Sequence, residues 1–208
     1  MATKPPVVPG APATSGTAAT FPDCVPELVG DGIILRAPSE ADIPYLVEQC
    51  QDPTSQQFVP LPNPYGVKDA REFLRGFVRE EWESGVRQEF VIDVAGPKDQ
   101  TTFGGTIALR NHGNGRHEIG FIAHPAARGK GVMTRAGERL ITYAFADLGA
   151  QMILWRAYEG NEGSRRVAQK LGFTIHEPIR KWAVNHGVLV DEWLGTLLPT
   201  DPSEEWRG

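Results

Sequence analysis

Cysteine is scarce in this chain of 208 residues, which contains only Cys24 and Cys50. The two form no Cys-x-x-Cys pair, so neither a disulfide framework nor a zinc ribbon is indicated. The five histidines fit no zinc-ligand spacing either, and we expect no bound metal. We interpret both cysteines as reduced thiols and expect a cytoplasmic protein.

Long apolar runs and an excess of positive charge are also missing. No stretch approaches the roughly 20 apolar residues of a membrane span, and the N-terminus lacks the apolar core of a signal peptide. The formal net charge is −5, which argues against a general nucleic-acid surface and weakly favours cationic, amine-bearing ligands. We therefore expect neither a membrane nor nucleic acid as a partner.

The hydrophobic pattern predicts a mixed α/β domain built around a mostly antiparallel sheet. Helices are predicted at 40–50, with Ser39 as N-cap, and at 68–84, 132–148 and 161–172. Strands are predicted at 32–37, 89–95, 103–110, 116–123, 151–158, 173–178 and 188–198. The proline-rich stretch 51–66 is predicted to be a loop.

The segment 124–134, HPAARGKGVMT, joins a predicted strand to a predicted helix. It contains no Walker A string. It approaches the dinucleotide fingerprint but ends on Thr134, so a dinucleotide-binding enzyme, with Glu159 as the ribose-binding acid, stays a minor alternative. It also suits a pyrophosphate cradle, because a helix N-terminus offers free N–H groups and Arg128 and Lys130 add charge at its mouth. A tight turn with solvated cations explains this segment alone equally well.

A second segment, NEGSRRVAQKLGF at 161–173, follows one helix and one strand later. Asn161 is a good helix N-cap and Gly172 a good C-cap, so the segment by itself is an ordinary short helix. The two segments in this order and at this separation are much more specific than either alone.

Together these segments resemble the GNAT acetyltransferase superfamily, and within it the RimJ/RimL-type branch that includes ribosomal-protein N-terminal acetyltransferases. The superfamily's cofactor motif, Gln/Arg-x-x-Gly-x-Gly/Ala, reads Arg128-Gly-Lys-Gly131-Val-Met133, and the branch's Asn-x-x-Ser reads Asn161-Glu-Gly-Ser164. The opening GIILRAPSEADIPYL and the strand HEIGFIAHP are also similar. The resemblance covers residues 28–198, so we expect a disordered N-terminal tail at 1–27 and a C-terminal tail at 199–208.

The resemblance implies a sheet with a splayed fourth strand and the binding of acetyl-CoA as acyl donor. Phe121, Ile122 and Ala123 would pair with the pantetheine arm, and Asn161 and Ser164 would lie near the sulfur. The pyrophosphate would be held by the backbone amides of Arg128, Gly129, Lys130, Gly131, Val132 and Met133. The implied reaction is acetyl transfer to a primary amine, on a protein N-terminus or a small molecule, by direct attack in a ternary complex.

Glu118 is the candidate general base, since many superfamily members carry a Glu there, although a solvated strand Glu is an alternative. Ser164 is the candidate acid, with His124 and Glu159 in reserve. Met133 stands where the motif prefers Gly or Ala. Ala168 and Ala183 stand where relatives carry an acid Tyr and a catalytic Glu.

Those two alanines motivate the main alternative, a non-catalytic acyl-CoA-binding or sensor domain of the same fold. The acceptor site is expected between the loop 52–66 and the last hairpin, around Trp182–Trp193. A homodimer is expected.

Overall fold

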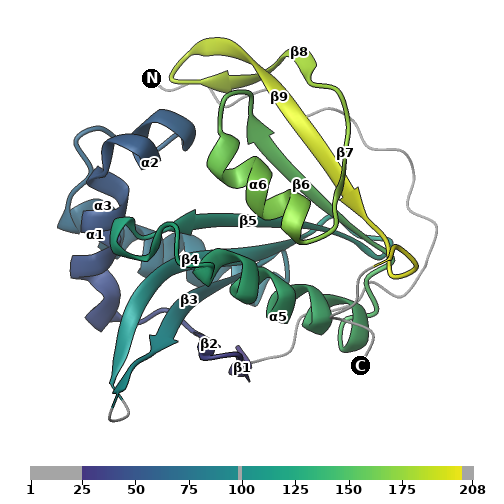
Figure 1. Ribbon diagram of the computed structural model, residues 1–208. Helices are drawn as coiled ribbons and strands as arrows, with labels where there is room; N and C mark the ends of the chain where they lie inside the picture. Colours follow the sequence, from purple (N-terminus) through teal and green to yellow (C-terminus); the bar gives the residue numbers. More distant parts are fainter. Residues whose placement is uncertain (1–24, 98–99, 203–208) are drawn as a thin grey trace.

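The computed structural model describes residues 25–97 and 100–202. These residues form a nine-stranded sheet with helices on both faces (Figure 1). The strands are β1 (Leu28–Gly30), β2 (Ile33–Arg36), β3 (Arg87–Ala95), β4 (Thr101–Asn111), β5 (Arg116–Ala123), β6 (Met152–Tyr158), β7 (Thr174–Ile175), β8 (Ile179–Asn185) and β9 (Val188–Leu197). The helices are η1 (Glu40–Asp42), α1 (Ile43–Gln51), α2 (Pro53–Phe58), α3 (Val67–Glu72), η2 (Phe73–Val78), α4 (Arg79–Glu83), η4 (Pro125–Ala127), α5 (Val132–Ala146) and α6 (Glu162–Lys170).

The strands run in the spatial order β1-β2-β3-β4-β5-β6-β9-β7, and β8 pairs with β9. Every pairing is antiparallel except that of β5 with β6. The predicted fold class, a mixed α/β domain around a mostly antiparallel sheet, is confirmed. The strand predicted to be splayed is β5.

Helices α5 and α6 cover one face of the sheet, and α1 to α4 lie on the other (Figure 1). Side chains alternate along each strand. On β3, for example, Phe90 and Ile92 join the main core beneath α5, whereas Glu89 points to the opposite face. A smaller core around Ile43 and Leu46 fixes α1 to that opposite face. Within the described residues, no helix combines the length and the apolar character needed to cross a membrane.

Two consecutive glycines in β4 bend the sheet next to the start of α5. The pairing of β3 with β4 shifts by one residue at Ile92/Asp93, which is a β-bulge, and Gly105 there has a φ of 133°. A Cβ on Gly105 would lie 2.3 Å from the Ile122 carbonyl oxygen, and one on Gly104 would lie 2.9 Å from the Val132 side chain. Only glycine therefore lets the end of β5 and the first turn of α5 approach β4 this closely.

Most predicted elements are confirmed, and the differences have local causes. The predicted helix 68–84 is a continuous run of α3, η2 and α4 in which η2 is π-helical. The predicted loop 51–66 contains α2, because Asp52 caps its N-terminus and Pro53 suits its first turn. Strands β1 and β8 were not predicted.

The β8 strand is mostly exposed, and its pairing with β9 is interrupted between Ile179 and Ala183, so it lacks a clear alternating pattern. Strand β7 is shorter than the predicted 173–178. The predicted tails lie outside the described residues except for 25–27 and 199–202, which hold neither helix nor strand. The domain boundaries stay a prediction.

One arginine joins three segments at the edge of the sheet. The guanidinium of Arg36, on β2, donates two hydrogen bonds to Asp42, of 2.8 and 2.9 Å, and two to Asp93 on β3, of 2.7 and 3.1 Å. Asp42 also accepts a hydrogen bond from the backbone N–H of Ser39, the N-cap of the first helical turn. Burial tends to raise the pKa of Asp42, but the hydrogen bonds from Arg36 and Ser39 lower that pKa overall.

Because both aspartates are nearly buried, we expect Arg36→Met to lower the free energy of unfolding by about 3 kcal/mol. Urea titration should measure this loss. In the control Arg75→Met, the lost pair with Glu40 is exposed, so the loss should stay below about 1 kcal/mol. Equal losses in the two variants would contradict the assigned role of Arg36.

Candidate active site

Strands β5 and β6 separate partway along their length. They pair in parallel only between Arg116–Ile119 and Met152–Trp155. From Gly120 to Ala123, β5 pairs with β4 alone in the described part of the chain. One edge of this β5 segment therefore presents backbone N–H and C=O groups to an extended ligand rather than to a strand.

Two cavities meet where these strands diverge. A groove of about 370 Å³ lies toward the N-terminus of α5, and a cavity of about 680 Å³ lies on the α1 to α4 side of the sheet. Both are lined by Phe58, Val59, Phe121, Ile122, Asn161 and Ser164. A molecule in the groove can thus meet a molecule in the cavity next to Ser164.

The segment between β5 and α5 forms the floor of the groove. Gly129 and Gly131 have φ values of 74° and 71°, and a Cβ on either would meet no atom within 4 Å. The side chains of Val132 and Met133 turn into the core, so their backbone lines the groove. The N–H groups of this first turn of α5 have no partner within the helix, and free N–H groups at a helix N-terminus can bind an anion.

Arg128 contributes differently from what the sequence led us to expect. Its guanidinium donates to Asp52 (2.6 Å), to the Ser55 hydroxyl (3.1 Å) and to the Ala123 carbonyl oxygen (3.4 Å). Asp52 also caps α2 by accepting from the Ser55 backbone N–H. Arg128 therefore clamps α2 against the groove, and its positive charge is largely compensated by Asp52.

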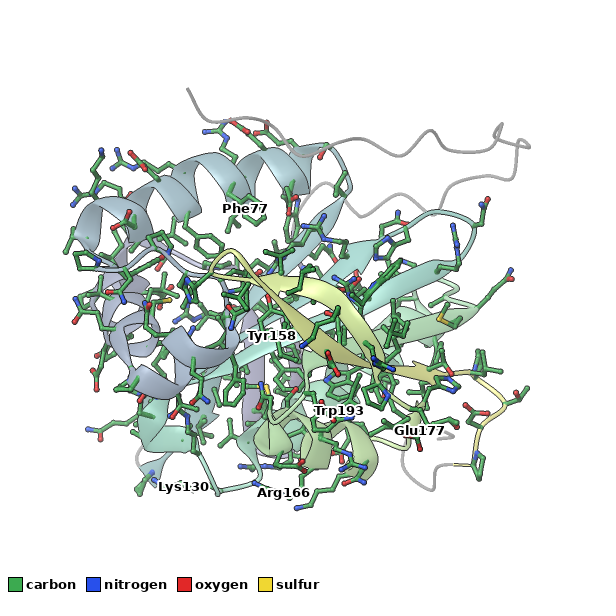
Figure 2. All side chains as sticks on the ribbon, turned by 90° about the horizontal axis from the view of Figure 1, so that it is seen from above. Phe77, Lys130, Tyr158, Arg166, Glu177 and Trp193 are labelled. Carbon is green, nitrogen blue, oxygen red and sulfur yellow. The ribbon has the colours of Figure 1, made fainter. Side chains whose placement is uncertain are left out.

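Besides Arg128, two positive side chains from another element line the groove. Arg166 and Lys170, on α6, line it, whereas Lys130 is exposed at its mouth. Figure 2 shows Lys130 and Arg166 projecting from the same side of the molecule. Sequence reasoning missed Arg166 and Lys170, although the run Arg165-Arg166 and Lys170 in a short polar helix was a signal.

Asn161 and Ser164 begin α6 at the junction of the two cavities. The Asn161 side chain accepts from the Ser164 backbone N–H at 3.1 Å, which caps the helix. The Ser164 hydroxyl accepts from the Trp155 indole N–H at 3.0 Å. Because this bond uses a lone pair, the hydroxyl proton of Ser164 is free to be donated to another group.

Three charged side chains from different strands share one wall of the larger cavity. Arg156, on β6, lies 3.3 Å from Glu118 on β5 and 3.7 Å from Glu192 on β9. The other oxygen of Glu118 lies 2.9 Å from His112 Nε2. Glu118 thus has two partners, one lining the cavity and one on the β4–β5 turn.

Glu192, which sequence reasoning missed, is 5% exposed. Burial, reinforced by the charge of Glu118 and opposed by Arg156, raises the pKa of Glu192. Its Oε2 atom accepts no hydrogen bond from any described residue. The only signal in the sequence was an acidic residue within an apolar strand, Asp191-Glu192-Trp193.

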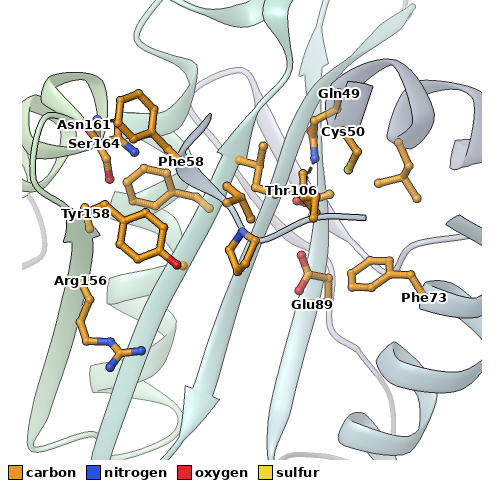
Figure 3. A pocket seen from close by; sticks show the side chains of 18 of the residues that line it. Gln49, Cys50, Phe58, Phe73, Glu89, Thr106, Arg156, Tyr158, Asn161 and Ser164 are labelled. Carbon is orange, nitrogen blue, oxygen red and sulfur yellow. Dashed lines mark hydrogen bonds between the residues drawn. The ribbon is translucent and has the colours of Figure 1, made fainter. Parts of the chain in front are cut away.

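The opposite wall contains another buried acid. Glu89 receives a hydrogen bond of 2.6 Å from Arg87, yet burial raises its pKa. Burial also raises the pKa of the Cys50 thiol to about 11. Figure 3 shows Glu89 and Cys50 across the cavity from Arg156 and Tyr158. The aromatic residues that line the cavity are Phe58, Tyr65, Phe73, Phe77, Phe121, Trp155 and Tyr158.

The expected acceptor region is only partly represented in this lining. The stretch 52–66 contributes residues 58–62 and Tyr65. The last hairpin contributes Glu192, while Trp182 is 61% exposed and Trp193 lies in the main core. The reserve candidates His124 and Glu159 are not among the residues that line either cavity.

Residues 33–174 match the family described as the acetyltransferase (GNAT) domain, and the chain belongs to this family. YdaF of Bacillus subtilis (strain 168), provisionally named a ribosomal N-acetyltransferase, is 35% identical over 106 residues. That match covers 50% of this chain and 56% of YdaF, so the chain spans about half the length of this relative.

Solved structures with the same fold include Mycobacterium smegmatis RimJ in complex with CoA-disulfide, with a TM-score of 0.72 and 20% identity. The match covers 88% of this chain and 90% of that one. The ribosomal L7/L12 α-N-protein acetyltransferase RimL, in complex with coenzyme A, has a TM-score of 0.71 at 17% identity, covering 83% of this chain and 98% of that one. Their CoA complexes belong to those proteins; the likeness to this chain is one of fold.

The Arg128–Asp52 clamp should be measurable by hydrogen exchange. We expect Arg128→Gln to speed exchange of the α2 amides about fivefold to tenfold, because a charge-assisted hydrogen bond is lost. Asp52→Asn should have a similar effect, and the double variant should add little to either. Lys130→Gln is the control and should leave α2 unchanged. Unchanged α2 exchange in Arg128→Gln would contradict the clamp.

Glu192 should weaken the fold at neutral pH. A carboxyl whose pKa is raised on folding ionises more readily in the unfolded chain, so it destabilises the fold once the pH exceeds about 4.3. We expect Glu192→Gln to raise the melting temperature at pH 7.5, with the gain shrinking toward zero near pH 4.

The neighbouring Asp191 is a control of opposite sign. A backbone hydrogen bond from Lys181 lowers the pKa of Asp191, so Asp191→Asn should reduce stability at pH 7.5, and this loss should also fade in acid. A gain from Glu192→Gln that did not depend on pH would mean that ionisation is not its cause.

Proposed function

We propose that this protein is an acetyl-CoA-dependent N-acetyltransferase that acts on a primary amine by direct attack in a ternary complex. The observation that supports this most directly is the meeting of the groove and the cavity beside Ser164, between the diverging ends of β5 and β6. Such an arrangement lets two substrates enter from opposite sides and react where they touch. Membership of the acetyltransferase (GNAT) domain family supports the choice of acetyl-CoA as donor.

The groove suits the donor in shape and charge. The edge of β5 at Phe121, Ile122 and Ala123, which no described strand pairs, would accept the pantetheine arm as an added strand. The amides from Arg128 to Met133 would hold the pyrophosphate at the start of α5. Arg166 and Lys170 add positive charge to the same groove. Asn161 would lie near the pantetheine, since it borders both cavities.

The chemistry requires the acceptor to become a neutral amine. Free alkyl amines titrate near ~10.4 and α-amino groups near ~7.7–8.0, so a base must take a proton at neutral pH. Glu118 is our candidate base: it lines the cavity, and Arg156 and His112 hold its two oxygens. His112 lies outside the cavity lining and is partly exposed, which gives the proton a way to solvent.

In the transfer itself, the amine nitrogen bonds to the acetyl carbon and the carbon–sulfur bond breaks. Backbone N–H groups at the splayed end of β5 would stabilise the oxyanion that forms on the acetyl oxygen. Ser164 would donate its hydroxyl proton to the departing thiolate and recover one from solvent or from the amine. The hydrogen bond from Trp155 supports this role, because it stabilises negative charge on the Ser164 oxygen.

The positions that differ from relatives are compatible with this assignment. Met133 keeps its side chain in the core and leaves its backbone at the groove. Ala168 is fully buried and lines neither cavity, so the acid is sought at Ser164 instead. Ala183 lies on β8 outside the cavity lining, so the base is sought elsewhere on the cavity wall.

The acceptor is a protein N-terminus or a small-molecule amine. The name of YdaF favours a protein acceptor, and a cavity of about 680 Å³ has room for the first residues of a peptide. The cytoplasmic location, the homodimer and the absence of a metal stay predictions.

We expect the purified protein to release CoA from acetyl-CoA when supplied with primary amines, and a thiol reagent measures that release. The panel should include peptides with free N-termini, alkyl and aryl monoamines, and diamines. Ser164→Ala and Glu118→Gln should each lower kcat about a hundredfold, because each removes a proton-transfer group. Glu177→Gln, an exposed acid outside both cavities, is the control and should keep the activity.

CoA binding without release in the presence of every amine would favour the non-catalytic alternative. Calorimetric titration of each variant with CoA separates loss of donor binding from loss of chemistry. NADH binding without CoA binding would instead support the dinucleotide alternative.

A further inference from the structure

The larger cavity carries more negative than positive charge. Five acids line it, Asp69, Glu72, Glu89, Glu118 and Glu192, against two arginines, Arg87 and Arg156. On the cavity wall formed by β5, β6 and β9, Glu118 and Glu192 share the single guanidinium of Arg156. This group of three therefore has a formal net charge of −1, and one cation would balance it.

Of the three buried or half-buried glutamates that line the cavity, Glu192 alone receives no hydrogen bond from a described residue. Glu89 accepts from Arg87 at 2.6 Å, and Glu118 is 2.9 Å from His112 Nε2. The Oε2 atom of Glu192 is buried, and Arg156 approaches it only to 3.7 Å, beyond hydrogen-bonding distance. A buried carboxylate oxygen without a donor is costly, so a ligand that supplied a donor to Glu192 would be stabilised there.

The position of Glu192 is fixed by the sheet. β9 lies between β6 and β8, and Glu192 is paired in register with Tyr158 on one side and Ile179 on the other. The next residue, Trp193, enters the main core on the opposite face, where its ring packs under Arg165. Because Glu192 is paired with a strand on each side and Trp193 is anchored in the core, the Glu192 carboxylate is held at the cavity wall beside Tyr158.

We propose that Glu192 binds the ammonium group of the acceptor, so that the enzyme selects amines that enter as cations and carry an apolar or aromatic body. This inference rests on the proposed acetyl transfer. The ammonium donates an N–H to the Glu192 carboxylate and neutralises the charge of the Glu118–Arg156–Glu192 group. Glu118 then takes one proton from the nitrogen, and the free amine attacks. The aromatic lining of the cavity contacts the rest of the acceptor.

The titration behaviour of Glu192 agrees with an ammonium ligand. Burial raises its pKa because the carboxylate lacks sufficient compensation. A bound ammonium would supply that compensation and favour the ionised form.

A binding experiment tests the inference separately from turnover. The protein saturated with CoA is titrated at pH 7 with 2-phenylethylamine, a cation at this pH, and with 2-phenylethanol, its neutral counterpart. We expect the wild-type protein to bind the amine at least about tenfold more tightly, as a charge-assisted hydrogen bond implies. Glu192→Gln should lose most of this preference, and Glu177→Gln should retain it.

Kinetics give a second readout with the fastest peptide or amine of the panel. Glu192→Gln should raise KM for the amine about tenfold and change kcat by less than about threefold. Glu118→Gln should instead act mainly on kcat. Melting temperature and CoA affinity of Glu192→Gln check that the fold and the donor groove are intact, and Glu192→Asp, which keeps the charge, should recover part of the affinity.

Several outcomes would overturn the inference. They are equal or undetectable binding of the two probes by the wild-type protein, an unchanged amine preference in Glu192→Gln, or a loss confined to kcat. Failure of the proposed function looks different, because the wild-type protein would then release no CoA with any amine while the binding preference could still be measured.

Discussion

The divergence of β5 and β6 is the constraint on which the rest of this structure depends. Four residues of parallel pairing hold the two strands together, and beyond Ile119 the described part of the chain pairs a strand with β5 on one side only. Backbone polar groups need partners, so such an edge is a binding surface by its nature. The bulge at Gly104–Gly105 keeps the end of β5 and the start of α5 close to it. The groove and the larger cavity are the two sides of this opening, and in the proposed function they take the acyl donor and the acceptor.

Around that opening, several side chains stabilise the fold while the backbone next to them lines the groove. Arg128 stands in the cofactor motif, yet its guanidinium is bonded to Asp52 and Ser55 and secures α2. Met133 and Val132 anchor the first turn of α5 in the core and leave its N–H groups facing the groove. Further positive charge in the groove comes from α6, through Arg166 and Lys170. The segment 128–133 thus sets the backbone conformation of the groove more than it adds positive charge to it.

In the larger cavity, burial sets the direction in which the pKa of two carboxyl groups shifts. Glu89 and Glu192 are kept from water, which raises the pKa of both, while Glu118 is bound by His112 and Arg156. The raised pKa values of Glu89 and Glu192 thus follow from burial, and perturbed carboxyl groups of this kind are common where a protein binds a ligand or moves a proton. Burial of the Glu192 carboxylate lowers the stability of the fold. Such a destabilising feature is typical of a functional site.

The sequence by itself determined the fold class, most helices and strands, and the two segments that identified the family. These depend on local patterns: apolar periodicity, caps such as Ser39 and Asn161, and glycines that need a positive φ. It did not reveal α2, because prolines obscured the Asp52 cap, or β8, because an exposed and interrupted strand has no alternation. Only the tertiary structure decided that Arg128 pairs with Asp52, 76 positions away, and that β5, β6 and β9 bring Glu118, Arg156 and Glu192 together. Such contacts join residues distant in the chain, and the raised pKa of Glu192 depends on a burial that no local pattern encodes.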